Sequence, residues 1–329
     1  MRRILMLTMA ATLLMPVMAQ GQARRPAPKP AARAAAIVQK VIPPKAVYWL
    51  SAQTMTGFGM GGNMPSPGDM MRMAMSGQHV VHWRIDTEVD GHLRRGEDAF
   101  GNITHMFYPD GPVQRVALHV TGEVDTIESH GVLTGSYERL PSTVYLRQTE
   151  LTVPDDAIKQ LARQLDAGDA LASCHRLTGL LYNSMTFDAD VTHAHSDAAH
   201  AFAIRAGVCQ DYAHVFLSVA RCMGIPARYV SGHLVRADGF ITQPAAHAWA
   251  EALIPDLGWV AFDPTNGMCA TEAYLRVAVG LDYRDCAPVR GARRGGGMET
   301  MNVAVTTQAT GQHPGLGELG RQTQVQNQS

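Results

Sequence analysis

Three side chains in the second half of the chain have the types and the order that thiol chemistry needs. The first is Cys209, in GVCQDYAH (207–214), which stands directly before an apolar run with helical spacing. This pattern predicts that Cys209 lies at a helix N-terminus, where free backbone N–H groups and the helix dipole favour the nucleophilic thiolate. Taken alone, the residue could also be an inert buried cysteine.

The other two side chains lie on segments that predict a β-hairpin. Residues 247–254 (HAWAEALI) and 259–267 (WVAFDPTNG) flank a turn at 255–258. Because hairpin strands run antiparallel, His247 and Asp263 are expected at the same end. With Cys209 they form a set in which His247 takes the thiol proton, Asp263 orients the imidazole, and a thioester forms at an amide carbonyl.

Periodic patterns predict the elements that must hold these residues. A helix start at 154–156 precedes apolar residues with helical spacing, a second helix is predicted over 169–185, and a third over 196–205, with Ser196 as its N-cap and Gly207 marking its end. Residues 80–150 instead alternate between apolar and polar and carry repeated turn signals, which predicts a small antiparallel β domain. The expected fold class is therefore α+β.

Several of these segments together resemble one known family. The chain is similar to the transglutaminase-like superfamily, in its bacterial form with an N-terminal β domain, over about residues 83 to 308. The segments that carry the resemblance are EDAFGN (97–102), YLRQTELT (145–152), GVCQDYAH (207–214), GIPARYVSG (224–232), HAWAE (247–251), GWVAFDPTNG (258–267) and VAVGLDYRDCAPVRG (277–291).

The resemblance implies a papain-like core of helices packed on an antiparallel sheet, over residues 151–308, after the β domain at 80–150. It implies Cys209 as nucleophile, His247 as general base and Asp263 as orienting group. It implies no cofactor and no metal site. The expected activity is cysteine-dependent acyl transfer on peptide or glutamine-type amides of a protein or peptide substrate, with hydrolysis favoured over cross-linking.

The first 79 residues differ from the rest of the chain in composition and sequence pattern. Residues 1–19 begin with two arginines and an apolar run that ends at a small-residue site, which predicts a cleaved secretory signal and an exported, periplasmic or secreted protein. The run is shorter than a bilayer span, so a permanent membrane anchor is the weaker interpretation, and a cytoplasmic location is the alternative if the segment is not a signal. Residues 20–79 predict a linker and a Met/Gly-rich segment (Met55 to Met75), and residues 309–329 predict a disordered tail.

Composition excludes several classes of protein. The 329 residues are 46% hydrophobic and 17% charged, which excludes a wholly disordered chain. The net charge is −1, from 28 basic and 29 acidic residues, so the chain lacks the excess of basic residues that is typical of nucleic-acid-binding proteins. Five scattered cysteines predict neither a disulfide scaffold nor a zinc site.

Other conspicuous residues have weaker interpretations. His193, His195 and His200 are predicted to be solvated or capping residues rather than metal ligands. His214 is predicted to have a packing or hydrogen-bonding role, with a joint site with Cys209 as the alternative. The two tryptophans, at 249 and 259, either wall the cleft or fill the core.

A non-catalytic protein is the alternative to an enzyme. Such a protein would be exported and would bind a peptide in the cleft, or Cu(I) through the thioethers of the Met-rich segment and nearby histidines. The complete set of Cys209, His247 and Asp263 argues against this alternative.

Overall fold

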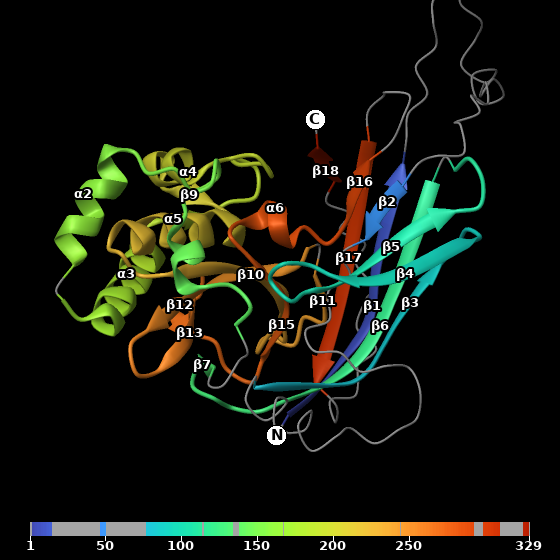
Figure 1. Cartoon of the computed structure of the whole chain (residues 1–329), viewed down its shortest axis with the longest axis horizontal. Helices are drawn as coiled ribbons and strands as arrows, with labels where there is room; N and C mark the ends of the chain where they lie inside the picture. The colour runs from blue at the N-terminus through green and yellow to red at the C-terminus, as the bar shows by residue number, and fades with distance from the viewer. Residues whose placement is uncertain are drawn as a thin grey trace, which may run out of the picture.

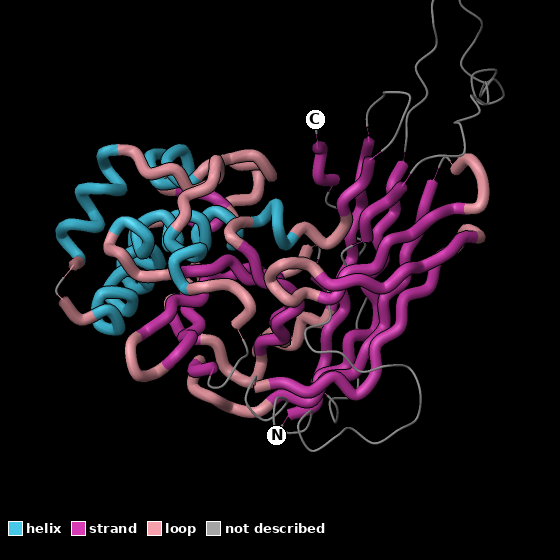
Figure 2. The backbone as a smooth tube through the Cα atoms, viewed as in Figure 1, coloured by secondary structure: helices cyan, strands magenta, loops and turns pink. Residues whose placement is uncertain are grey.

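The computed structural model describes most of the chain. The described residues are 2–14, 47–50, 77–113, 115–133, 138–166, 168–243, 245–292, 299–309 and 325–328. They form an α+β structure in which a helical layer lies against one antiparallel sheet, with further β-structure beyond that sheet (Figures 1 and 2). The predicted α+β class is confirmed.

The central sheet carries the predicted hairpin. Within the described residues its strands are, in spatial order, β14 (Met268–Cys269), β13 (Gly258–Asp263), β12 (His247–Ile254), β10 (Ala227–Leu234) and β15 (Tyr274–Gly280), with β7 (Val132–Leu133) paired to β13. Ala250 pairs with Phe262 and Ile254 with Gly258, so β12 and β13 form the antiparallel hairpin that the sequence predicted. The strands are almost fully buried because helices cover one face of the sheet and packed side chains cover the other.

The helices of the described residues are α2 (Asp156–Leu165), α3 (Ala170–Ser184), α4 (Ala198–Ile204), α5 (Cys209–Cys222) and the short α6 (Tyr283–Cys286), with a 3₁₀ turn η2 (Ser142–Leu146). Among them, α2 to α5 begin where the sequence predicted or within two residues of it, whereas α6 and the 3₁₀ turn were not predicted. Asp155 and Asp169 cap α2 and α3 by accepting hydrogen bonds from backbone N–H groups at 2.8 and 3.1 Å.

The predicted N-cap of α4 is wrong. Asp197 accepts a hydrogen bond from the backbone N–H of His200 at 2.8 Å, so Asp197 is the cap. The Ser196 hydroxyl instead accepts a hydrogen bond from the backbone N–H of His193 at 3.0 Å. Ser196 therefore orders the loop before the helix, and the carboxylate one residue later takes the capping position.

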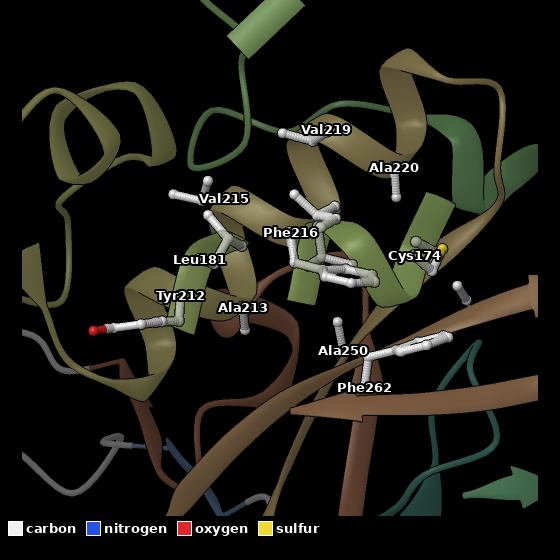
Figure 3. Close-up of a cluster of buried hydrophobic side chains, with 14 of the residues drawn as sticks. Cys174, Leu181, Tyr212, Ala213, Val215, Phe216, Val219, Ala220, Ala250 and Phe262 are labelled. Carbon is white, nitrogen blue, oxygen red and sulfur yellow. The ribbon is translucent and has the colours of Figure 1, made fainter. Parts of the chain in front are cut away.

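Helix α5 is buried on all sides. Every residue from Asp211 to Arg221 is buried, because α2, α3 and α4 and the central sheet surround the helix. Figure 3 shows Phe216 of α5 close to Phe262 of β13, and the ring centroids of these two residues lie 5.4 Å apart. The helix that begins with Cys209 is thus fixed by core packing, which gives the thiol a defined position.

A chain of buried charges holds the strands of the central sheet together. The Arg228 guanidinium on β10 donates to Glu251 on β12 at 2.6 Å and to Glu138 at 2.8 Å. Arg276 on β15 donates to Glu251 at 3.2 Å. Each of these buried charges therefore has an opposite charge beside it, which is the condition for burying it at all.

Beyond the central sheet, the described residues form two further antiparallel sheets. One has the order β11 (Thr242–Gln243), β17 (Glu299–Ala309), β1 (Arg2–Leu14), β6 (Arg115–Thr126) and β3 (Gln78–Thr87), with β18 (Val325–Gln328) on β17. The other has the order β16 (Arg290–Ala292), β2 (Val47–Leu50), β5 (Ile103–Pro109) and β4 (Gly91–Glu97). All these pairings are antiparallel, and strands from the C-terminal part of the chain join those of residues 80–150.

Two side-chain amides join the β region to the central sheet. The amide of Gln78 donates to the Arg276 carbonyl at 2.7 Å and accepts from the Arg276 N–H at 2.9 Å. The amide of Asn102 makes the same pair of bonds to Val279, at 2.7 and 2.9 Å. Two amides thus satisfy backbone groups along β15 in the way that a neighbouring strand would.

Residues 2–14 take a place that differs from the predicted signal. They form β1, which pairs with β6 on one side and β17 on the other. A segment that is cleaved on export cannot also be a strand of the mature sheet, so the two assignments exclude each other.

Other predictions for the chain ends lie outside the described residues. These are the linker at 20–46, the Met-rich segment from Met55 to Met75 and most of the tail at 309–329. Where the structure does describe the predicted linker (20–79) and tail, it differs from the prediction, because residues 47–50, 78–79 and 325–328 are in strands β2, β3 and β18. No helix within the described residues is long and apolar enough to cross a membrane.

Candidate active site

Cys209 is the first residue of α5, and a short parallel strand pair leads into it. The pair is β8 (Thr186–Phe187) with β9 (Ala206–Gly207). A Cβ added at Gly207 would lie 2.5 Å from a carboxylate oxygen of Asp211, so the close turn needs glycine. The Asp211 carboxylate accepts hydrogen bonds from the Val208 N–H at 2.8 Å and from the Thr192 hydroxyl at 2.7 Å. The Asp211 carboxylate therefore fixes the turn before Cys209 through hydrogen bonds to Val208 and Thr192.

The hairpin brings His247 and Asp263 into direct contact. The His247 Nε2 atom lies 2.7 Å from Oδ2 of Asp263. This bond occupies Nε2 and leaves Nδ1 free of the carboxylate, and Cys209 is a second group that raises the pKa of the imidazole. The structure thus brings together all three residues that the sequence singled out.

The protonated form of His247 is strongly favoured. Burial alone would lower the pKa of the imidazole, but the charge and hydrogen bond of Asp263, together with those of Cys209, raise this pKa to about 10. The imidazolium therefore persists across neutral pH beside the thiol. Since the ordinary pKa is 6.5, the protonated group stabilises the fold fully below pH 6.5, and that contribution is lost as pH rises through about 10.

Asp263 is a fully buried carboxylate that accepts hydrogen bonds on both oxygens. Oδ1 accepts from the backbone N–H groups of Thr265 at 2.9 Å and Asn266 at 3.2 Å. Oδ2 accepts from His247, from the Asn266 amide at 2.7 Å and from the Tyr274 hydroxyl at 2.7 Å. Burial opposes the charge, but His247 and these donors hold the pKa of Asp263 below its usual range.

Sequence reasoning missed Asn266 and Tyr274. Asn266 had a usable signal, because it lies in the turn directly after Asp263, where side chains commonly bond back to the preceding residue. Tyr274 had none. It begins β15, and its contact with Asp263 depends on how β15 and β13 are arranged in the sheet.

The two tryptophans have different places. The Trp249 ring lies 6.1 Å from the His247 ring and 5.4 Å from the Tyr274 ring, so this core residue also packs against two side chains of the site. Trp259 packs against Tyr145 at 5.0 Å and under the Arg228 guanidinium at 3.9 Å, which makes it a core residue.

His193, His195 and His214 have roles outside this set. His214 is fully buried and accepts a hydrogen bond from the Tyr283 N–H at 3.2 Å, so the predicted hydrogen-bonding role is confirmed. Burial lowers its pKa to about 4. His193 and His195 lie 6.3 Å apart between ring centroids, and the described residues contain no group of three His, Cys, Asp or Glu that could hold a metal ion.

The four other cysteines have less reactive surroundings. Burial, with a smaller effect of Cys269, raises the pKa of Cys174 to about 12. Burial also raises the thiol pKa values of Cys222, Cys269 and Cys286. Selective alkylation of Cys209 is therefore feasible.

Comparison with known proteins identifies the family. The model of the transglutaminase-like superfamily matches residues 159–264, and the model of the bacterial transglutaminase-like N-terminal region matches residues 71–125. An uncharacterised protein of Mycobacterium leprae is 43% identical over 247 residues, which are 69% of this chain and 86% of that protein. The chain belongs to the transglutaminase-like superfamily.

Two further relatives extend this picture of a transglutaminase-like chain. The crystal structure of a predicted cysteine protease of Cytophaga hutchinsonii has the same fold, with a TM-score of 0.65 and 16% identity over 99% of this chain and 98% of that one. A protein-glutamine gamma-glutamyltransferase of Pseudomonas aeruginosa is 41% identical over 70 residues, 20% of this chain and 10% of that protein. The transglutaminase-like match contains Cys209, His247 and Asp263, whereas Tyr274 lies beyond it.

Proposed function

We propose that this protein is a cysteine-dependent acyl-transfer enzyme in which Cys209 is the nucleophile, His247 the general base and Asp263 the residue that orients the imidazole. One observation carries the proposal. The His247 imidazole is hydrogen-bonded at Nε2 to a buried carboxylate at 2.7 Å, and its pKa is raised further by Cys209, which begins a buried helix.

The first half of the reaction forms a thioester. The Cys209 thiolate attacks an amide carbonyl carbon, and the carbonyl oxygen becomes an oxyanion that backbone N–H groups at the start of α5 can stabilise. The C–N bond then breaks while the His247 imidazolium protonates the leaving amine or ammonia. The acylated sulfur carries no charge, so His247 loses the thiolate that had helped to hold its proton.

The second half regenerates the enzyme. Neutral His247 takes a proton from water, the resulting hydroxide attacks the thioester, and the carboxylic acid leaves as the thiolate returns. Cross-linking replaces water by a primary amine. We favour hydrolysis, because water reaches any solvent-facing thioester whereas an amine must first be bound and oriented.

A protein or peptide is the proposed substrate, with its peptide or glutamine-type amide as the acyl donor. The chemistry of the site supports an amide, since a pre-formed imidazolium can protonate a poor amine leaving group. The relative from Pseudomonas aeruginosa, whose name specifies protein glutamine, supports the glutamine side chain as the first amide to test.

The test of the proposed function is mass spectrometry of glutamine-containing peptides incubated with the protein. We expect conversion of amide to acid in water. A peptide–amine adduct formed in the presence of a primary amine would show cross-linking instead. Peptides that remain unchanged in both reactions, and in a screen of backbone amides, would contradict the proposal.

His247→Ala is expected to slow the alkylation of Cys209 by iodoacetamide at pH 6 by more than about tenfold. The proposed mechanism pairs the attacking thiolate with the His247 imidazolium, and alanine cannot supply that charge. Site-resolved mass spectrometry against pH makes the measurement, and the exposed Cys222 is the internal control, because its labelling should not change. Equal Cys209 rates and equal pH midpoints in the two proteins would show that the residues are not coupled.

Export remains a proposal, supported by the paired arginines and the apolar run of residues 1–19. We expect protein isolated from its source to begin near Gln20. N-terminal sequencing is decisive, because a mature chain that retains residues 2–14 would rule out the signal and agree with their place as β1.

A further inference from the structure

One oxygen of Asp263 is shared by three side-chain donors. His247 Nε2, the Tyr274 hydroxyl and the Asn266 amide each lie 2.7 Å from Oδ2. Tyr274 Oη lies 3.4 Å from the Asn266 amide nitrogen, so the two donors are also neighbours. The Tyr274 ring is 5.9 Å from the His247 ring, which places its hydroxyl beside the imidazole and on the same acceptor.

Donors that share an acceptor compete for its charge. A carboxylate oxygen that accepts a strong hydrogen bond from a tyrosine has less negative charge to offer the imidazolium. The effect of this competition on the pKa of His247 has a fixed sign. Each added donor stabilises ionised Asp263 and weakens the hold of Asp263 on the proton of His247.

This balance matters most after Cys209 has been acylated. The leaving amine has by then taken the proton of His247, and only neutral His247 can activate water. Asp263 is the anion that favours reprotonation of His247 from solvent, so a carboxylate that raised the pKa of the imidazole too far would keep His247 protonated and trap the thioester.

We propose that the Tyr274 hydroxyl, together with the Asn266 amide, is a positioning group that limits how tightly the Asp263–His247 pair holds its proton, and so keeps His247 able to act as a base on the thioester. The inference rests on the proposed function. Tyr274 acts through Asp263 and touches neither the thiol nor the substrate in this role.

The other groups that face His247 do not supply the same control. Cys209 on α5 faces the imidazole but is neutral once acylated or alkylated. His233 on β10 is buried, and its burial together with the charge of His247 lowers its pKa to about 4, so it stays neutral over the relevant range. Asp263 and Tyr274 also lie against the ring within the part of the chain that the structure describes.

The test measures the titration of His247 directly. Protein labelled with ¹⁵N-histidine is alkylated at Cys209 with iodoacetamide, which removes the thiolate as acylation does, and the imidazole is followed by NMR against pH. The His247→Ala protein identifies the signal. We expect Tyr274→Phe to raise the His247 midpoint by about 1 pH unit, because the aromatic ring stays while the competing donor is lost.

Tyr145→Phe is the matched control. The Tyr145 hydroxyl is also buried and also donates to a carboxylate, Glu138, at 3.2 Å, but it lies beside Trp259, away from His247. We expect this change to affect thermal stability and to leave the His247 midpoint unchanged. A shift that appears in both variants would reflect general loosening and would overturn the proposal.

The remaining outcomes are also decisive. An unchanged or lowered midpoint in Tyr274→Phe overturns the proposal. If that variant does not fold, Asn266→Ala makes the same measurement at an exposed position that donates to the same oxygen, and an unchanged midpoint there overturns it equally. A failed proposed function gives a different result, since the midpoint of the unmodified protein would then be the same before and after alkylation of Cys209.

Discussion

Cys209→Ala is expected to reduce amide turnover to background, whichever amide proves to be the substrate. The methyl side chain of alanine cannot attack a carbonyl, so no thioester forms and neither half of the reaction proceeds. The measurement is conversion of glutamine peptides by mass spectrometry. A thioester adduct trapped on the unmodified protein by acid quenching should be absent from the variant.

Cys222→Ala is the matched control for this prediction. Cys222 is the last residue of the same helix and is exposed, so the change removes a thiol from α5 without touching the site. Turnover in this variant should equal that of the unmodified protein. Substantial turnover by Cys209→Ala would show that the nucleophile lies elsewhere.

Asp263→Asn is expected to lower turnover by up to ~10⁴-fold. Five hydrogen bonds point at the Asp263 carboxylate, which accepts on both oxygens and donates nothing. An asparagine must direct its NH₂ group either at the two backbone N–H groups or at the three side-chain donors. Either orientation places N–H against N–H, and the charge that holds His247 is lost.

Making Asp263→Asn in the His247→Ala protein separates its effect on activity from its effect on stability. Without the imidazole, Asp263→Asn should cost little further activity, because both residues act as one unit. The loss of thermal stability from unpaired buried donors should remain in that background. Additive losses of activity in the double variant would contradict the assignment of Asp263 as the partner of His247.

The central residues of the site could be predicted because local patterns determine them. The apolar period after Cys209 defines a helix start, and a hairpin with a short turn brings its two ends together whatever surrounds it. Each inference needed fewer than about twenty residues of sequence. The same holds for α2 and α3, whose capping aspartates and apolar spacing lie next to each other in the chain.

Contacts between distant strands could not be predicted in this way. Tyr274 meets Asp263 only because β15 and β13 lie in one sheet, and Gln78 meets Arg276 across 198 positions of sequence. The pairing of Arg228 with Glu251 and Arg276 likewise depends on strand register. The prediction of the α4 N-cap was wrong by one residue. Ser196 and Asp197 are both residue types that cap helices well, and only the conformation of the loop determines which of them does so.

The position of β17 has a consequence for the order in which the protein is assembled during synthesis. This strand begins at Glu299 and pairs with β1 at one end of the sequence and with β11 in the middle. Helices α2 to α5 and the β12–β13 hairpin are all synthesised before β17, so the half of the protein that carries Cys209 and His247 can pack first. Closing the outer sheet joins segments almost the whole chain apart, which makes that step the slow one and leaves the edge of β11 open until the last strand arrives.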